Sequence, residues 1–314
     1  MTVDILSVTF AVAILCAALM GFAIQRGATC AVAAVGEIVQ TGKASKLIAL
    51  VEAALWVSSG VILAQGLGRV THLPLGYDVT IHTLVGGAIL GLGAFVNRAC
   101  VFGAIAKLGS GNWAYVLTPV GYFMGAASFP QDLRMGPPTR GAILDHHPQL
   151  TRWIMLVAGL YLAGRLVTHV IKSVRFRRPA EAVWSPHQAT LVIGMTFTIL
   201  FVLVGSWSYT EFLEQAAIAM AKGFGWKGLL FGALLAGAII GGARSGRLSL
   251  QMPAPIWLVR CFLGGVMMGW GSLLIPGSND GLILVGMPFL LPHAWVAMAA
   301  MCATIWLCFT VTRR

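Results

Sequence analysis

Two segments of the chain place a cysteine directly after the polar end of a glycine-rich apolar run. The first reads GFAIQRGATC over 21–30, and the second reads GLGAFVNRAC over 91–100. A short helix that begins near each cysteine would present free N–H groups and a positive dipole end. Helix N-termini of this kind bind anions. We therefore expect Cys30 and Cys100 to open two anion-attracting helices, with Thr29 as the N-cap of the first.

A third segment has the same plan without a cysteine. It reads GWGSLLIPGSNDG over 269–281, where a proline–glycine pair breaks the helix and Ser278 and Asn279 offer hydroxyl and amide donors. A neutral thiol with a pKa of about 8.5 donates weakly, which would let a permeating anion leave. We expect the three segments together to line a path for an anion. The residues expected along it are Gln25, Thr29, Cys30, Gly91, Gly93, Cys100, Gly271, Gly277, Ser278 and Asn279. Arg26 and Arg98 would either attract anions to one mouth of the path or anchor helix ends.

The other cysteines lie inside apolar runs, where cysteine behaves as a small buried hydrophobe. They are Cys16, Cys261, Cys302 and Cys308. The sequence has neither a CxxC pair nor a cysteine–histidine zinc spacing, so we expect no metal ion, no redox motif and no other cofactor.

The composition indicates a membrane protein. Of 314 residues, 58% are hydrophobic and 10% are charged, whereas soluble domains carry about 25% charged residues. The net charge of +11 would suit nucleic acid, but the basic residues lie in short gaps between apolar runs, where they set topology. We therefore expect the lipid bilayer, and no nucleic acid, as a partner.

Nine apolar runs approach the roughly 20 residues that a membrane helix needs. They lie near 5–24, 47–67, 81–96, 111–129, 152–171, 188–206, 226–242, 256–275 and 293–311. Three shorter stretches, near 28–39, 99–109 and 279–290, cannot cross alone and are predicted to be re-entrant half-helices. The Lys and Arg bias, strongest over 172–178, predicts an N-terminus outside and a C-terminus inside.

The glycine pattern repeats at one fixed offset. GGAILGLG over 86–93 and GGVMMGWG over 264–271 align four glycines at an offset of 178 residues, which also places Cys100 on Ser278. In the predicted topology the two copies run in opposite directions, as in the inverted repeats of many transporters.

The sequence thus predicts an all-α polytopic membrane protein with about nine transmembrane helices, re-entrant half-helices and an inverted pseudo-two-fold repeat. We expect a single membrane domain, with repeat halves over 1–129 and 188–314 and a central span with polar loops over 130–187.

The chain resembles the YeeE/YedE family of sulfur-transport membrane proteins, which includes bacterial thiosulfate transporters. The matching segments are GFAIQRGATCAVAAVGEI (21–38), GGAILGLGAFVNRACVFGAIAKLGSG (86–111) and GGVMMGWGSLLIPGSNDGLI (264–283). The resemblance implies an inner (cytoplasmic) membrane protein that takes up thiosulfate along a narrow path, relayed by cysteine thiols. Cys30 and Cys100 fall on two of the family's cysteines.

Two departures from the family pattern widen the choice of substrate. Ser278 stands where the family has its third cysteine, and Arg98-Ala99-Cys100 replaces a Gly-Gly-Cys motif. We rank two hypotheses above a third, a non-transporting sensor or assembly subunit, because no soluble output domain is predicted. The first is a transporter or channel, not an enzyme, for thiosulfate or for sulfite, sulfate or a selenium species. The second is a membrane sulfur-relay component that carries a persulfide to a small cytosolic sulfur-carrier protein.

Overall fold

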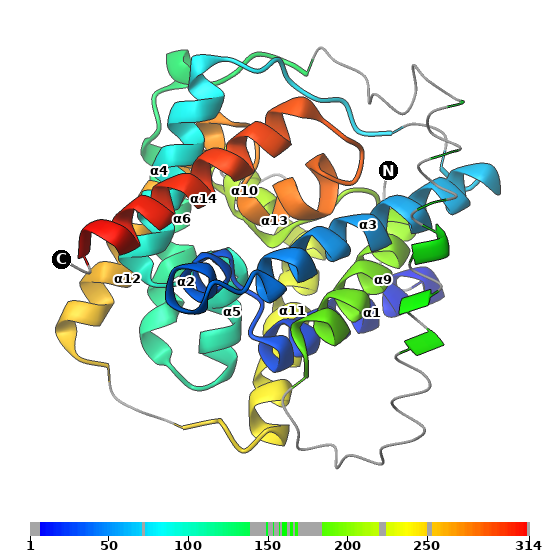
Figure 1. The fold of residues 1–314 in the computed structure, drawn as a ribbon, viewed down its shortest axis with the longest axis horizontal. Coiled ribbons are helices and arrows are strands. Elements are labelled where there is room, and N and C mark those ends of the chain that lie inside the picture. The colour runs from blue at the N-terminus through cyan, green and yellow to red at the C-terminus, as the bar shows by residue number, and fades with distance from the viewer. Residues whose placement is uncertain are drawn as a thin grey trace.

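In the computed structural model the described residues fold mainly into helices (Figure 1). The structure describes residues 7–70, 73–138, 184–219, 224–249 and 253–312, with isolated positions between 149 and 168, and no strand occurs among them. The α-helices are α1 (Val8–Gly27), α2 (Ala31–Thr41), α3 (Ser45–Gly66), α4 (Ile81–Asn97), α5 (Val101–Gly109), α6 (Leu117–Ser128), α9 (Pro186–Val204), α10 (Tyr209–Ala219), α11 (Phe224–Arg244), α12 (Pro255–Leu274), α13 (Asn279–Gly281) and α14 (Pro292–Thr312). Two 3-10 turns, η1 (Trp113–Val116) and η2 (Gln131–Leu133), and the π-helical turn η3 (Leu282–Gly286) complete the described elements.

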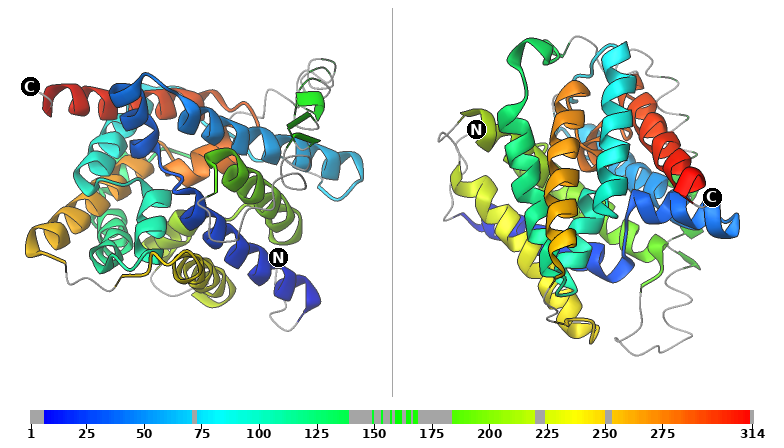
Figure 2. Two further views of the ribbon diagram at one scale, coloured as in Figure 1. Left: turned by 60° about the horizontal axis from the view of Figure 1, so that its bottom comes forward. Right: turned by 90° about the vertical axis from the view of Figure 1, so that its left-hand side faces the viewer.

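Eight of these helices lie in two rows. Helices α11, α1, α9 and α3 pack in that order, and α6, α12, α4 and α14 form the second row, which the right-hand view of Figure 2 shows. Shorter segments fill the space between the rows. Helix α2 contacts α3 and α14, α10 contacts α11 and α6, and η3 contacts α3 and α14.

Within the part of the chain that the structure describes, seven helical stretches are long and apolar enough to cross a membrane. They are Val8–Thr41, Ser45–Gly66, Ile81–Gly109, Pro186–Val204, Gly225–Arg244, Pro255–Leu274 and Pro292–Thr312, and they correspond to seven of the nine predicted spans. The predicted span 111–129 is shorter, with η1 leading into the 12-residue α6. Proline at 119 lacks a backbone N–H and favours the first turn of a helix. The predicted span 152–171, and most of the polar loops around it, lie outside the described residues.

Helix boundaries recur at the same offset as the glycines. Helices α1 and α9 begin at Val8 and Pro186, and α2 and α10 begin at Ala31 and Tyr209. Each pair differs by 178 positions, as do the starts of α5 and α13. Helices α2 and α10 are also equally long, with 11 residues each. The offset found in one glycine pattern therefore relates helix boundaries in both halves of the chain.

Helices α4 and α12 approach each other through glycines. A Cβ on Gly86 would lie 2.9 Å from the Gly271 carbonyl oxygen, and one on Gly271 would lie 2.7 Å from that of Gly86. Gly93 and Gly264 stand in the same relation at 2.8 Å in both directions. Small residues allow this close backbone approach. Because the start of each helix contacts the end of the other, α4 and α12 are antiparallel.

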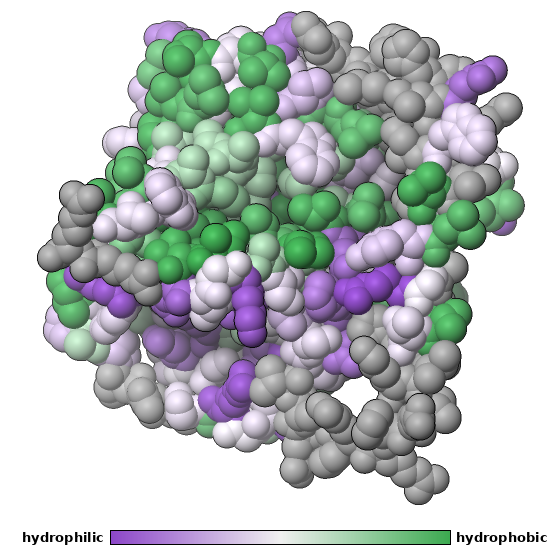
Figure 3. Space-filling model, in the orientation of Figure 1, coloured by the Kyte–Doolittle hydropathy of each residue, from purple (hydrophilic) through white to green (hydrophobic). Residues whose placement is uncertain are grey.

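Large apolar side chains remain exposed on the outer helices. In Figure 3 they cover the upper part of the visible face, where α4 and α14 lie in Figure 1, and hydrophilic residues gather in the band below. The exposed residues include Leu84, Val85 and Leu92 of α4 and Trp306 and Leu307 of α14. Apolar surface on this scale is suited to lipid rather than to water.

Candidate functional site

Three short helices begin at the three segments that the sequence singled out. Cys30, Cys100 and Ser278 are the N-cap residues of α2, α5 and α13, all in extended conformation and without a side-chain capping hydrogen bond. The prediction that Thr29 is the N-cap is therefore wrong by one residue. Ala28 ends α1 in a left-handed conformation, with φ of 46°, and the chain passes through Thr29 before it returns to helix.

The two cysteines occupy matching turns. Arg98, two residues before Cys100, is also left-handed, with φ of 54°. The N–H of Ala31 donates to Cys100 Sγ at 3.2 Å, and the N–H of Cys100 donates to Cys30 Sγ at 3.3 Å. Each sulfur therefore lies at the start of the other cysteine's helix, where N–H groups and the dipole favour negative charge.

This pair is enclosed by the protein. Cys30 is 7% exposed and Cys100 is fully buried. Helix α5 contacts the Cys30 side chain at Gly103, where a Cβ would lie only 2.5 Å from Cys30 Sγ. The Cys30 sulfur can therefore occupy this position only because Gly103 has no side chain.

A fourth turn, which the sequence analysis did not single out, lies between α9 and α10. It runs from Gly205 to Ser208, and Ser208 Oγ accepts a hydrogen bond from the Glu211 N–H at 3.2 Å. The 178-residue offset places Cys30 on Ser208. The 178-residue offset is therefore the signal in the sequence that indicates this turn.

The fourth turn faces the third through Asp280. The Asp280 carboxylate accepts hydrogen bonds from the Thr210 hydroxyl and, at 2.9 Å, from the Gly281 N–H. Asp280 is 1% exposed. Asp280 thus links α10 to α13, whereas in the first pair the Ala31 and Cys100 N–H groups donate to thiol sulfurs.

Val101 joins the two pairs of turns. Its N–H donates to Asn279 Oδ1 at 3.4 Å, and its carbonyl oxygen accepts from the Tyr209 hydroxyl at 2.9 Å. Val101, Asn279 and Tyr209 are the first residues of α5, α13 and α10. The starts of α2, α5, α10 and α13 therefore meet in one buried region, which we call the junction.

Several buried polar atoms around the junction have no hydrogen-bond partner among the described residues. They are Thr29 Oγ1, Trp207 Nε1, Ser278 Oγ and Asn279 Nδ2, and none of the four residues is more than 5% exposed. A buried unsatisfied polar group costs about 1–3 kcal/mol, so it points to a water, ion or ligand. All four atoms can donate, which suits an anion.

The sequence also predicted roles for Gln25, Arg26 and Arg98, which precede the two cysteines. Gln25 and Arg26 are each 2% exposed, and the Arg26 guanidinium lies 5.8 Å from the centre of the Phe22 ring. Arg98 is exposed and lies 5.6 Å from the centre of the Trp257 ring. Both arginines thus contact aromatic rings near helix ends, and their attraction of anions stays a prediction.

The predicted glycines lie in helix contacts or in a turn. A Cβ on Gly91 would lie 2.6 Å from the Met301 carbonyl oxygen of α14, while Gly93 and Gly271 belong to the α4–α12 contact. Gly277, with φ of 157°, precedes Ser278 in a region that favours glycine. Packing and turn geometry account for all four, and a role beside an anion stays a prediction.

The other cysteines lie apart from the pair. Cys16 and Cys261 are buried in the core, and Cys302 and Cys308 are half-buried on α14. No group of three or more potential metal-ligating side chains occurs within the part of the chain that the structure describes.

Residues 26–307 match a family described as "Sulphur transport". The chain is also similar to the thiosulfate transporter TsuA of Escherichia coli (strain K12), with 23% identity over 324 residues. That similarity covers 93% of this chain and 92% of TsuA.

Proposed function

Because the chain belongs to the sulphur-transport (YeeE/YedE) family, we propose that it moves a small sulfur-containing anion, with thiosulfate as the first choice, across the cytoplasmic membrane. The observation that carries this proposal is the reciprocal contact of Cys30 and Cys100, in which each thiol lies at the start of the other's helix. The relative named as a thiosulfate transporter supports the choice of substrate.

The junction supplies what a dehydrated anion needs. Moving an ion from water into hydrocarbon costs tens of kcal/mol unless other groups replace its hydration shell. The N-termini of α2 and α5, the two thiols and the unpartnered donors of Ser278 and Asn279 provide such groups. Thiol, hydroxyl and amide donors are neutral and bind weakly, so a permeating anion can leave again.

We infer that the thiols act as a relay. An anion that reaches the Ser278 and Asn279 donors passes to Cys100 and Cys30 by exchanging one hydrogen bond for another. The terminal sulfur of thiosulfate matches the weak S–H donor, and Ser278 in place of a third thiol makes that end of the relay more tolerant of oxyanions such as sulfate or sulfite.

We infer further that the two halves form an inverted repeat around the junction. Under the 178-residue offset, Gly86 and Gly93 correspond to Gly264 and Gly271, and the contacts Gly86–Gly271 and Gly93–Gly264 exchange with one another. Contacts that map onto themselves in this way are expected for a two-fold axis. This arrangement makes α2, α5, α10 and α13 re-entrant half-helices. We infer nine spans, and the basic loop over 172–178 supports an N-terminus in the periplasm and a C-terminus in the cytoplasm.

The burial of the thiols favours transport over a sulfur relay to a cytosolic carrier protein. A persulfide carrier must present a nucleophilic thiolate to its partner, whereas Cys30 and Cys100 are 7% and 0% exposed. A stable sulfur adduct on either cysteine, detected by mass spectrometry after incubation with thiosulfate, would support the relay instead.

The proposal is tested by uptake in cells that lack their own thiosulfate transport. Cells expressing the wild-type chain should grow on thiosulfate, and growth on sulfite, sulfate and selenite should be compared. Cys30→Ala and Cys100→Ala should each abolish uptake while inserting normally, whereas Cys302→Ala, a half-buried cysteine on α14, should retain it. Unchanged growth in both junction variants would refute the proposal.

A further inference from the structure

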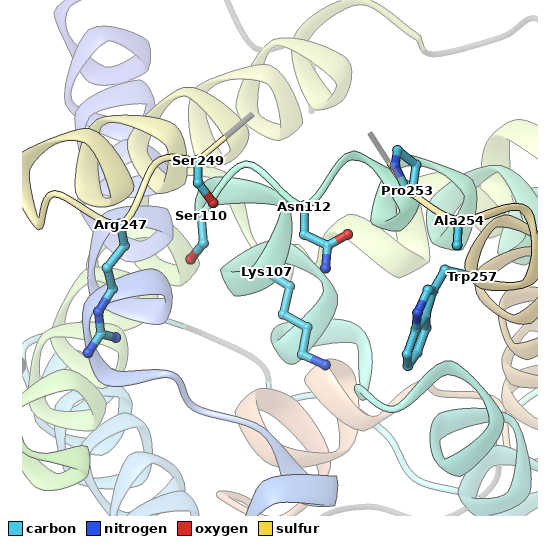
Figure 4. A pocket seen from close by; sticks show the side chains of 8 residues that line it. All are labelled: Lys107, Ser110, Asn112, Arg247, Ser249, Pro253, Ala254 and Trp257. Carbon is cyan, nitrogen blue, oxygen red and sulfur yellow. The ribbon is translucent and has the colours of Figure 1, made fainter. Parts of the chain in front are cut away.

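A cavity of about 470 Å³ lies where α5 ends and α12 begins. Its lining combines basic and polar side chains with an apolar wall, and no carboxylate is found among the described residues that line it. The lining residues are Lys107, Ser110, Asn112, Arg247, Ser249, Pro253, Ala254 and Trp257. In Figure 4, Lys107 lies between Arg247 on one side and Trp257 on the other, with Ser110, Asn112 and Ser249 above it.

Among the residues that the structure describes, no carboxylate pairs with the positive charges around the cavity. The guanidinium groups of Arg98 and Arg260 lie 5.6 and 5.5 Å from the centre of the Trp257 ring. Lys107 and Arg247 line the cavity itself, and Arg98 and Arg260 lie near its Trp257 wall, so four cations belong to this region. Within the described part of the chain, none of the four forms an ion pair with a carboxylate. Low-dielectric walls lined by charge of one sign raise the local concentration of counter-ions.

The cavity is joined to both cysteine turns by single hydrogen bonds. Lys107 Nζ donates to the Arg98 carbonyl oxygen at 2.9 Å, two residues before Cys100. Gln25 Nε2, in the last turn of α1, donates to Ser110 Oγ at 3.2 Å. The cavity wall and the two turns that carry the thiols are therefore one connected polar structure.

A second set of bonds fixes the Lys107 end of this structure. Lys107 Nζ also donates to the Tyr115 hydroxyl at 2.8 Å, and that hydroxyl donates to the Asn97 carbonyl oxygen at 3.1 Å. Asn97 Nδ2 in turn donates to the Ala99 carbonyl oxygen at 2.7 Å. Lys107 is thus held beside the turn of Cys100 and still has one ammonium N–H for a ligand.

We propose that this cavity is an anion vestibule, a site that holds a divalent tetrahedral oxyanion such as thiosulfate or sulfate between the thiol pair and water. It rests on the proposed function and adds a second station to it. A water molecule has about 30 Å³ of liquid volume, so the cavity holds the anion together with part of its hydration shell. Binding is therefore electrostatic and moderately selective, and selection by sulfur chemistry is left to the thiols.

The decisive variant is Arg247→Gln, because Arg247 is exposed and lines the cavity. The matched control is Arg244→Gln, three residues earlier in the same region, which does not line it. In proteoliposomes, Arg247→Gln should raise the KM for thiosulfate presented to the face where α12 begins, which is cytoplasmic in the proposed topology, at least about threefold with an unchanged maximal rate, in line with one exposed charge contact. Arg244→Gln should leave both values unchanged.

Direct binding gives a readout that does not depend on transport. Purified protein in nanodiscs of zwitterionic lipid should bind sulfate by calorimetry, and Arg247→Gln should weaken that binding by the same factor. An unchanged KM and unchanged sulfate affinity in both Arg247→Gln and Lys107→Gln would overturn the vestibule while leaving the thiol proposal intact. Wild-type uptake by Cys100→Ala would instead overturn the proposed function.

The phosphate of an anionic lipid headgroup is also a tetrahedral oxyanion. The experiment must therefore distinguish a bound lipid from a free ion. Sulfate affinity that is unchanged when phosphatidylglycerol is added to the nanodiscs supports the vestibule. Loss of sulfate binding on that addition, with phosphatidylglycerol binding that depends on Arg247, would identify a lipid site and overturn the proposal.

Discussion

The substitution Gly103→Ala tests whether the position of the Cys30 sulfur matters for transport. The new Cβ would lie 2.5 Å from Cys30 Sγ, 3.0 Å from Cys30 Cβ and 3.1 Å from Ala99 Cβ. Ordinary heavy-atom contacts lie at about 3.5–4.0 Å, so the sulfur must move by about 1 Å or more. Its 3.3 Å hydrogen bond from the Cys100 N–H would be lost.

The size of the effect can be worked out from opposing contributions. Alanine in place of glycine favours a helix by about 1 kcal/mol, while overpacking of a full site costs about 1–3 kcal/mol. The protein should therefore still fold. The lost hydrogen bond is worth about 0.5–1.5 kcal/mol, which corresponds to as much as about tenfold in uptake.

The assay is uptake of radiolabelled thiosulfate, normalised to the amount of protein in the membrane fraction. The matched control is Gly281→Ala, because the 178-residue offset places Gly103 on Gly281 and a Cβ there would meet nothing within 4 Å. Gly103→Ala should reduce uptake severalfold, and Gly281→Ala should not. Wild-type uptake by Gly103→Ala would refute the argument that the Cys30 sulfur needs this position.

Three further substitutions separate the roles of neighbouring residues. Ser278→Cys should favour thiosulfate over sulfate in competition assays, because the unpartnered Ser278 hydroxyl becomes a thiol; unchanged selectivity would count against a station there. Glu52→Gln should destabilise the protein by about 1–3 kcal/mol, because Glu52 is buried and binds Arg165 at 2.8 Å. Thermal unfolding in detergent checks this, and an unchanged midpoint would contradict it. Gly93→Val should lower the amount of inserted protein without changing selectivity, because any side chain meets the Gly264 carbonyl oxygen; normal insertion with altered selectivity would instead place Gly93 beside the anion.

Local signals in the sequence were enough to locate most helices and the two cysteine turns. Apolar runs of sufficient length predict spans by a simple length criterion. Seven of the nine predicted spans correspond to apolar helices among the described residues. Cys30 and Cys100 were expected at the start of short helices because polar residues and glycines interrupt the apolar runs before them. Both are N-cap residues in the structure.

Contacts between distant segments could not be derived in the same way. The two hydrogen bonds between the Cys30 and Cys100 segments join residues about 70 positions apart. They depend on how α2 and α5 pack, which a local sequence pattern does not specify. Helix α10 was missed because Glu211 and Glu214 make it too polar for a hydropathy criterion. The contribution of α10 to the junction is seen only in the structure, in which the Thr210 hydroxyl donates to the Asp280 carboxylate.

Proteoliposomes test the central claim most directly, because they contain no other transporter and no cytosolic partner. Purified wild-type protein should accumulate radiolabelled thiosulfate in the lumen, and Cys100→Ala, reconstituted to the same density, should reduce this to the level of empty liposomes. Thiosulfate uptake at the wild-type rate by Cys100→Ala would contradict transport through the thiol pair.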